Sequence, residues 1–102
     1  MGATLFPRGL MLTPDAAIDW DAPSLAALTE SDFDALLALD PKPEFVLLGS
    51  GPTLARPSPS LATALEAKGV GVEVMDSRAA ARAWGLLRGE GRHIAAALLP
   101  FA

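Results

Sequence analysis

The second half of the chain alternates between short apolar runs and longer amphipathic segments. Residues 45–48 form a continuous apolar run that ends at Gly49, as is typical of a strand buried on both faces. In residues 70–74, valine alternates with glycine and glutamate, which is the period of a strand, and residues 94–99 form a third apolar run. Two segments with helical spacing separate these runs. The order strand, helix, strand, helix, strand predicts an α/β fold built around a central sheet.

Capping signals place the two helices. Ser58, followed by a proline at the favoured first position, begins one helix, and Gly69 ends it. Asp76 or Ser77 caps the other helix, which runs to about Arg88. The apolar residues of this second helix recur at three- and four-residue intervals, so we expect one of its faces to pack on the sheet.

Residues 1–40 carry weaker signals than the rest of the chain. We expect short strands at residues 10–12 and 17–20, with a turn between them. Thr29 caps a short helix whose first turn is acidic. Negative side chains are favourable there, because the N-terminus is the positive end of the helix dipole. That helix ends before Pro41, because proline cannot continue it.

Length and composition narrow the possible functions. With 102 residues, of which 51% are hydrophobic, the chain is expected to form a single domain over residues 1–102. The absence of cysteine excludes a disulfide scaffold, a thiolate metal site and cysteine catalysis. His93 is the only histidine, which excludes a multi-histidine metal site and leaves one imidazole base with no evident orienting acid. We therefore expect no metal, no cofactor and no catalytic residues.

The net charge of −4 and its distribution bear on the choice of partners. An acidic chain lacks the cations that displace counterions from phosphates, so we expect no nucleic-acid partner. Residues 1–51 contain two basic and eight acidic side chains, whereas residues 52–102 contain six basic and four acidic ones. This asymmetry indicates either a solvated surface or two surfaces of opposite charge. No apolar stretch approaches the roughly 20 residues of a transmembrane helix and no signal peptide is evident, so we expect a cytoplasmic protein.

A glycine-rich loop, Gly49-Ser50-Gly51, follows the first predicted strand of the α/β region. A dinucleotide-binding loop would need a third glycine where Leu54 stands and a helix that starts directly on the loop, but prolines occupy that segment. We interpret the loop as a tight structural turn that needs the backbone freedom of glycine. Because the backbone amides of such turns can form an anion-binding nest, a ligand site here stays open as an alternative.

The second predicted helix of the α/β region carries the other candidate residues. Arg78 and Arg82 lie one helical turn apart and share a face, and arginine binds carboxylates and phosphates in a bidentate manner. They form either local ion pairs or an interaction patch. Arg92 follows the helix, and with Glu90 it is expected to brace the turn that enters the last strand. Trp84 is interpreted as a core or cleft-lining aromatic residue.

Several segments together resemble a small α/β family of unassigned biochemical activity. They are Gly49-Ser50-Gly51, Val72-Glu73-Val74-Met75, Asp76-Ser77, Ala80, Arg82 and Glu90-Gly91-Arg92. The family includes the mitochondrial NADH dehydrogenase 1 alpha subcomplex assembly factor 3 and an adipogenesis-associated human protein, and this chain looks like a bacterial member. Gly85 is a departure from the pattern, because the family commonly has asparagine at that position.

The resemblance implies a layered fold, with a mixed central β-sheet, about three helices packed on it and one strand antiparallel to the rest. For the mitochondrial relative it implies a non-enzymatic role in assembling the respiratory NADH dehydrogenase. Our leading hypothesis is therefore a non-enzymatic interaction protein that binds an unidentified protein partner and aids the biogenesis of a membrane-protein complex. The oligomeric state stays open.

The alternative hypothesis is a small-molecule or anion-binding protein, conceivably an enzyme, with a cleft at the glycine loop. In that case we expect Ser50, Arg82 and Arg92 to converge beside the loop. Both hypotheses draw on the same candidate residues for the cleft or interaction surface. These are Gly49, Ser50, Gly51, Arg78, Arg82, Trp84 and Arg92.

Overall fold

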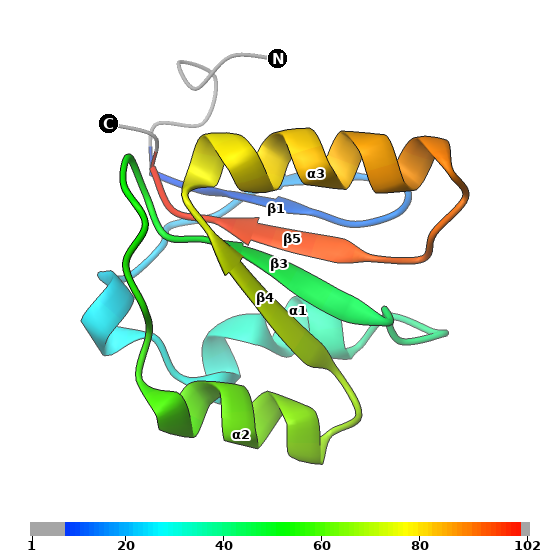
Figure 1. The fold of residues 1–102 in the computed structure, drawn as a ribbon. Coiled ribbons are helices and arrows are strands. Elements are labelled where there is room, and N and C mark those ends of the chain that lie inside the picture. The colour runs from blue at the N-terminus through cyan, green and yellow to red at the C-terminus, as the bar shows by residue number, and fades with distance from the viewer. Residues whose placement is uncertain (1–7, 101–102) are drawn as a thin grey trace.

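A five-stranded sheet with the strand order β2-β1-β5-β3-β4 forms the centre of the computed structural model, which describes residues 8–100 (Figure 1). The strands are β1 (Leu10–Leu12), β2 (Ala17–Asp19), β3 (Phe45–Gly49), β4 (Gly71–Met75) and β5 (Ala95–Leu98). The helices are the 3₁₀ turns η2 (Leu25–Ala27) and η3 (Glu30–Phe33) and the α-helices α1 (Asp34–Leu37), α2 (Pro59–Ala67) and α3 (Ser77–Gly89).

The sheet is mixed, and one strand runs against the others. β3 is parallel to both β4 and β5, whereas β1 is antiparallel to β5 on one side and to β2 on the other. The predicted α/β fold, with a mixed sheet, about three helices and one antiparallel strand, is therefore confirmed. The two strands expected at the N-terminus are also present, and they form a hairpin at one edge of the sheet.

Helices cover both faces of the sheet and explain the continuous apolar run in β3 (Figure 1). Helix α3 lies on one face, while α2 and the η3–α1 segment lie on the other. Successive side chains of a strand point to opposite faces. Val46 and Leu48 accordingly belong to the core cluster with Phe33 and Leu65, and Leu47 belongs to the cluster under α3. A central strand between two helical layers needs apolar side chains at every position.

The caps of the two long helices follow the sequence signals. Ser58 precedes α2 and accepts a hydrogen bond from the backbone N–H of Ser60, with proline at the first helical position. Of the two candidate caps for α3, Asp76 is the one used, and its carboxylate accepts from the N–H of Ala79 at 2.9 Å. Both caps satisfy N–H groups that the first turn of a helix leaves without a partner.

The helix expected after Thr29 is shorter and tighter than the sequence pattern indicates. It consists of the four-residue 3₁₀ turn η3 followed by the single turn α1. Asp32 accepts from the backbone N–H of Thr29 at 2.8 Å, which closes a capping box around the 3₁₀ turn. The tight turn places Phe33 and Leu36 in one core cluster, and both are fully buried. Packing of these two side chains therefore outweighs helical periodicity in this short segment.

Candidate functional site

Internal hydrogen bonds hold the loop that follows β3. The hydroxyl of Ser50 donates to the carbonyl of Thr53 at 2.8 Å and accepts from the N–H of Ala55 at 3.1 Å. The backbone N–H of Ser50 donates to the carbonyl of Met75 at the end of β4. The hydroxyl of Ser50 thus bonds within its own loop and its N–H bonds to β4, which is the geometry of a structural turn.

Ser77, the first residue of α3, connects this loop to the helix. Its hydroxyl accepts from the N–H of Gly51 at 2.9 Å and donates to the carbonyl of Leu99 at 2.8 Å, and the residue is fully buried. Its own N–H donates to the carbonyl of Gly51 at 2.8 Å. A Cβ atom at Gly49 would lie 2.7 Å from the Ser77 hydroxyl oxygen, so this position has room only for glycine.

The position of Ser77 was not recognised as a joint from the sequence. The sequence indicates a possible helix cap at Ser77 but not its bonds to the glycine loop, because its partners are distant in sequence. The available signal was the pairing of a residue without a side chain, Gly49, at the end of one strand with a small hydroxyl side chain at the start of the following helix. The glycine loop and the N-terminus of α3 therefore form one packed unit.

A shallow hollow of about 330 Å³ lies beside the loop. Its wall includes Pro23, Leu25, Ser50, Pro52 and Leu99, and none of its lining residues within 8–100 is ionisable. The amides of Ser50 and Gly51 donate inside the fold rather than into this hollow. The hollow therefore lacks the charged side chains that would hold an anion.

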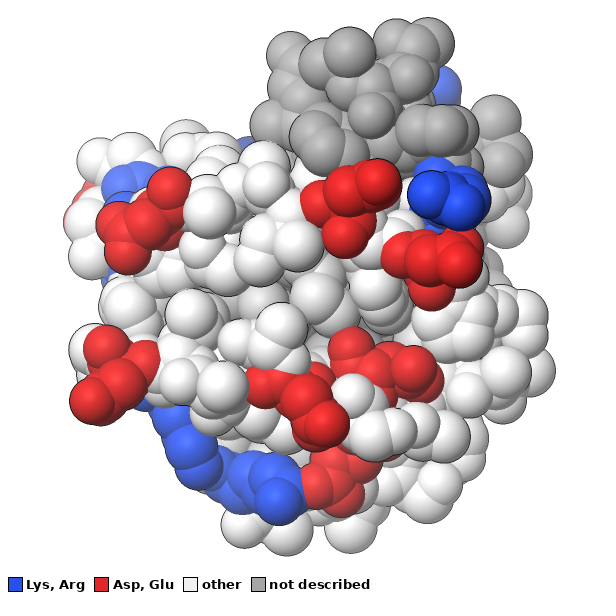
Figure 2. Space-filling view, turned by 180° about the vertical axis from the view of Figure 1, so that it is seen from behind, with Lys and Arg blue, Asp and Glu red and all other residues white. Residues whose placement is uncertain are grey.

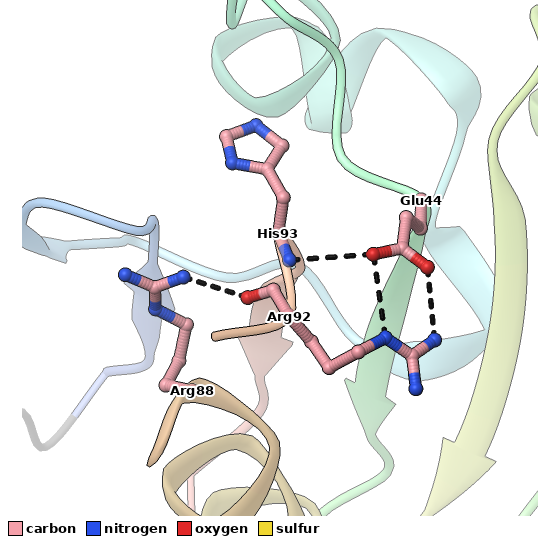
Figure 3. A network of polar contacts seen from close by, with 4 residues as sticks. All are labelled: Glu44, Arg88, Arg92 and His93. Carbon is pink, nitrogen blue, oxygen red and sulfur yellow. Dashed lines mark hydrogen bonds and ion pairs between the residues drawn. The ribbon is translucent and has the colours of Figure 1, made fainter. Parts of the chain in front are cut away.

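Arg92 lies at the opposite end of β3 from the glycine loop (Figure 3). Its guanidinium donates to both carboxylate oxygens of Glu44, from Nη2 to Oε1 at 2.9 Å and from Nε to Oε2 at 3.3 Å. The same group lies over the ring of Phe45, 5.8 Å from its centroid. The prediction that Arg92 pairs with Glu90 is thus wrong, because its partner is Glu44. β3 and β5 are parallel neighbours, and this pairing aligns the residues that precede them, so that Glu44 meets Arg92.

The predicted convergence of Ser50, Arg82 and Arg92 does not occur. Glu44, with which Arg92 pairs, precedes β3, whereas Ser50 follows it, so the strand separates Arg92 from the loop. Arg78 and Arg82 lie on the exposed side of α3. Trp84 is partly buried and packs against the core cluster under α3, and its indole N–H is buried without a hydrogen-bond partner within residues 8–100.

Further bonds make the Arg92 end of the sheet a structural brace (Figure 3). Arg88 donates from Nη1 to the carbonyl of Arg92 at 2.6 Å and from Nη2 to the carbonyl of Pro14 at 3.3 Å. The ring nitrogen Nε2 of His93 lies 2.8 Å from the carbonyl oxygen of Pro41. These contacts join the β1–β2 turn, the segment before β3 and the end of α3. The only imidazole of the chain is therefore engaged in holding loops together.

The structure also shows where the uneven charge lies. Figure 2 shows acidic side chains spread over the face opposite to the view of Figure 1, with basic side chains near its rim. Lys68 pairs with Glu30 at 3.0 Å, and Arg92 pairs with Glu44, so acids of the first half meet bases of the second half. The fold thus neutralises part of the asymmetry between the two halves of the sequence.

Comparison with known proteins assigns the chain to a family. A model described as "Protein of unknown function (DUF498/DUF598)" matches residues 1–99. The chain belongs to the DUF498/DUF598 family. This confirms the resemblance inferred from the glycine loop and the residues around the start of α3.

Curated proteins similar to this DUF498/DUF598 member include an assembly factor. NADH dehydrogenase (ubiquinone) 1 alpha subcomplex assembly factor 3 of Bos taurus is 34% identical over 89 residues, which are 87% of this chain and 48% of that protein. An uncharacterized protein of Rhodobacter capsulatus is 37% identical over 92 residues, covering 90% of this chain and 68% of that protein. The chain spans about half the length of the assembly factors that it matches.

Solved structures share the fold of this DUF498/DUF598 chain. A crystal structure of a Bordetella parapertussis protein has a TM-score of 0.82 and 35% identity, covering 93% of this chain and 80% of the other. A Bordetella pertussis protein described as an Mth938-like domain has a TM-score of 0.76 and 29% identity, covering 93% and 75%. Within residues 8–100 of the present chain, no helix has the length and apolar character needed to span a bilayer.

The ion pair between Arg92 and Glu44 should make the stability of this family member depend on pH. Hydrogen bonds from the Arg92 guanidinium lower the pKa of Glu44 below its ordinary value of 4.5, and Glu44 in turn raises the pKa of Arg92. A lowered pKa in the folded state gives stability that is present above the unfolded pKa and is lost as the pH falls through the folded value. We expect Glu44→Gln to lower the melting temperature near neutral pH.

The difference in melting temperature between the wild type and Glu44→Gln should shrink once the pH falls below about 4.5, the ordinary pKa of a glutamate. Thermal unfolding followed by circular dichroism over a pH series measures this difference. Glu66→Gln is the control, because Glu66 is exposed on α2 and pairs with no cation within residues 8–100. A Glu44→Gln difference that stays constant through the acid range would contradict the assignment of this ion pair.

Proposed function

We propose that this chain is a non-enzymatic protein-binding factor that takes part in the assembly of a membrane-protein complex. The curated relatives named as assembly factors of NADH dehydrogenase support this role. The chemistry of the candidate residues supports it too, because the hydroxyl of Ser50 and the ring of His93 are engaged in bonds within the fold. These groups stabilise loops of the fold, which is consistent with a protein that acts by binding a partner on its surface.

The proposed binding surface is the outer side of α3, defined by Arg78, Arg82 and Leu86. These residues follow one another at four-residue intervals and therefore form a stripe on one side of the helix. The observation that carries the proposal is the exposure of Leu86, which is 69% accessible and follows two exposed arginines along the stripe. Arginine beside an apolar side chain is a common composition of protein interfaces. The stripe suits a partner surface with acidic groups around an apolar contact.

The glycine loop is attached to the N-terminus of α3, and the segment that follows it carries exposed residues of the same kind. Ser77 bonds to Gly51 through both its backbone and its hydroxyl, so the loop is fixed relative to the helix. The loop that continues from there presents Leu54, which is 59% exposed, and Arg56, which is also exposed. The loop and the helix stripe thus share the same chemistry, a cation beside an exposed leucine.

Affinity capture from the native cell tests the α3 surface. The wild-type chain is compared with a double variant, Arg82→Glu with Leu86→Asp, which reverses one charge and removes the apolar contact. We expect recovery of the partner to fall by about tenfold or more, because truncating residues central to an interface commonly costs that much affinity. The matched control is Glu66→Lys with Ala67→Asp, two exposed residues near the end of α2.

Two outcomes would count against the proposal. Equal recovery of every captured protein by the wild type and the α3 double variant would reject this binding surface. Recovery of a specific partner that is neither a subunit nor an assembly protein of a membrane complex would reject the assembly role, while leaving protein binding in place. Mass spectrometry of the captured proteins distinguishes the two results.

A further inference from the structure

The two edges of the sheet differ in how well they are protected against pairing. β2, at one edge, has only three residues, and the exposed carboxylates of Asp15, Asp19 and Asp21 lie in it or next to it. Short length and charge are the means by which natural proteins prevent edge strands from pairing with other chains. β4, at the other edge, has five residues, no proline and one charged side chain, that of Glu73. Only the β4 edge has the composition of a strand that accepts a partner.

The hydrogen bonds of β4 show which of its backbone groups are open. The N–H of Gly71 donates to the carbonyl of Glu44, and the carbonyl of Met75 accepts from the N–H of Ser50, so both residues face β3. The N–H and C=O groups of successive residues point to opposite sides of a strand, so those of Val72 and Val74 point away from β3. Among residues 8–100, no strand lies on that side of β4 (Figure 1). β4 therefore presents two donors and two acceptors in a row.

We propose that β4 binds an extended segment of a partner protein as an additional antiparallel strand, with a lysine or arginine of that segment opposite Glu73 and apolar residues on either side. The backbone groups of Val72 and Val74 supply the hydrogen bonds, as in other cases of strand addition to a sheet edge. Glu73 then occupies the non-hydrogen-bonded pair, in which opposing Cα atoms approach to about 4.5 Å and side chains are close.

The side chains of β4 determine the chemistry of the added strand. Val72 and Val74 are partly buried against the core cluster on the α2 side, so apolar side chains opposite them would extend that cluster. Glu73 points to the other face and is exposed. An opposite charge directly across a strand pair stabilises it, and a like charge destabilises it. The sheet edge thus selects the alternation apolar, basic, apolar.

The same charge disfavours a second copy of this chain as the occupant. A two-fold antiparallel pairing over all five residues of β4 would place Glu73 opposite Glu73 of the second copy in a close pair. The repulsion between two carboxylates opposes that dimer and leaves a basic segment of a different protein as the favoured ligand. This edge is distinct from the outer side of α3, so the two proposed surfaces fail or succeed independently.

Binding of two short peptides to the full chain, followed by amide shifts in nitrogen–proton NMR spectra, tests the proposal. The probes are the acetylated and amidated peptides Thr-Val-Lys-Val-Thr and Thr-Val-Glu-Val-Thr. We expect the lysine peptide to shift the amide signals of Val72 and Val74 and to bind about fivefold more tightly than the glutamate peptide. Shifts that are absent from β4, or equal affinity of the two peptides, would overturn it.

Two variants complete the test. Glu73→Lys should reverse the preference, so that the glutamate peptide binds more tightly; an unchanged preference would contradict the role of Glu73. Val74→Pro should abolish binding of both peptides, because it removes an outward N–H and leaves the bonds to β3 in place. Should Val74→Pro unfold, the charge reversal decides alone. Concentration-dependent shifts in β4 of the wild type without peptide would show self-pairing and would also overturn the proposal.

Discussion

Gly49→Ala is expected to lower the free energy of unfolding by about 3 kcal/mol, the upper range for placing an extra methyl group in a packed interior. The new Cβ would lie 2.7 Å from the hydroxyl oxygen of Ser77 and 2.8 Å from both the Ser77 Cα and the Leu98 Cδ2. The Cα belongs to the backbone at the start of α3, so the clash cannot be relieved by rotating a side chain. Either the helix or the end of β3 must move.

Denaturant unfolding followed by circular dichroism measures the effect of Gly49→Ala. The matched control is Gly85→Ala, because an added Cβ there meets no atom within 4 Å. Gly85 lies in the middle of α3, where alanine is favoured over glycine by roughly 1 kcal/mol, so this variant should be more stable than the wild type. Similar losses of stability in both variants would show that the space beside Gly49 is not limiting.

Ser77→Ala is expected to destabilise the protein by about 2 kcal/mol. The Ser77 hydroxyl is the acceptor for the N–H of Gly51 and the donor to the carbonyl of Leu99. Removing it leaves both backbone groups without this partner beside a fully buried residue, and an unsatisfied buried polar group costs about 1–3 kcal/mol. The loss acts at the joint between the glycine loop, α3 and the end of β5.

Amide hydrogen exchange identifies where the Ser77→Ala effect arises. The N–H of Gly51 should exchange faster in the variant by more than the change in global stability explains, because it loses its acceptor. Ser60→Ala is the control: Ser60 also lies in the first turn of a helix, but it is exposed and its hydroxyl bonds to its neighbour Ser58. Unchanged exchange at Gly51 would contradict the assigned hydrogen bond.

The architecture could be predicted from local signals because its central elements report their environment directly. The apolar run at residues 45–48 indicates a strand covered on both faces, and the core contains its side chains on both sides. Ser58 and Asp76 mark helix starts through hydrogen bonds to residues only two and three positions away. Such short-range chemistry is present in the sequence itself. The antiparallel direction of one strand came instead from the family resemblance, since periodicity carries no direction.

The candidate site depended on pairings between distant residues, which local patterns do not contain. Arg92 has an acid two positions away in sequence, Glu90, but it pairs with Glu44 because two parallel strands align their starting ends. Ser77 contacts Gly51 and Leu99 because each of the three residues follows the end of a strand, and parallel strands end at the same edge of the sheet. The exposed positions of Arg78 and Arg82 on one side of α3, by contrast, follow directly from helical spacing, and their role as an interaction surface stays a prediction.

The place of β1 in the sheet has a consequence for the newly made chain. β1 is synthesised well before β5, yet β5 is its partner on the core side, with Leu10 opposite Leu98 and Leu12 opposite Ala96. Until those late residues emerge, β1 has only the three-residue pairing with β2. A contact between segments that are far apart in sequence closes a long loop and forms slowly. The sheet is therefore completed only once β5 has been synthesised, by docking of the β1–β2 hairpin onto that strand.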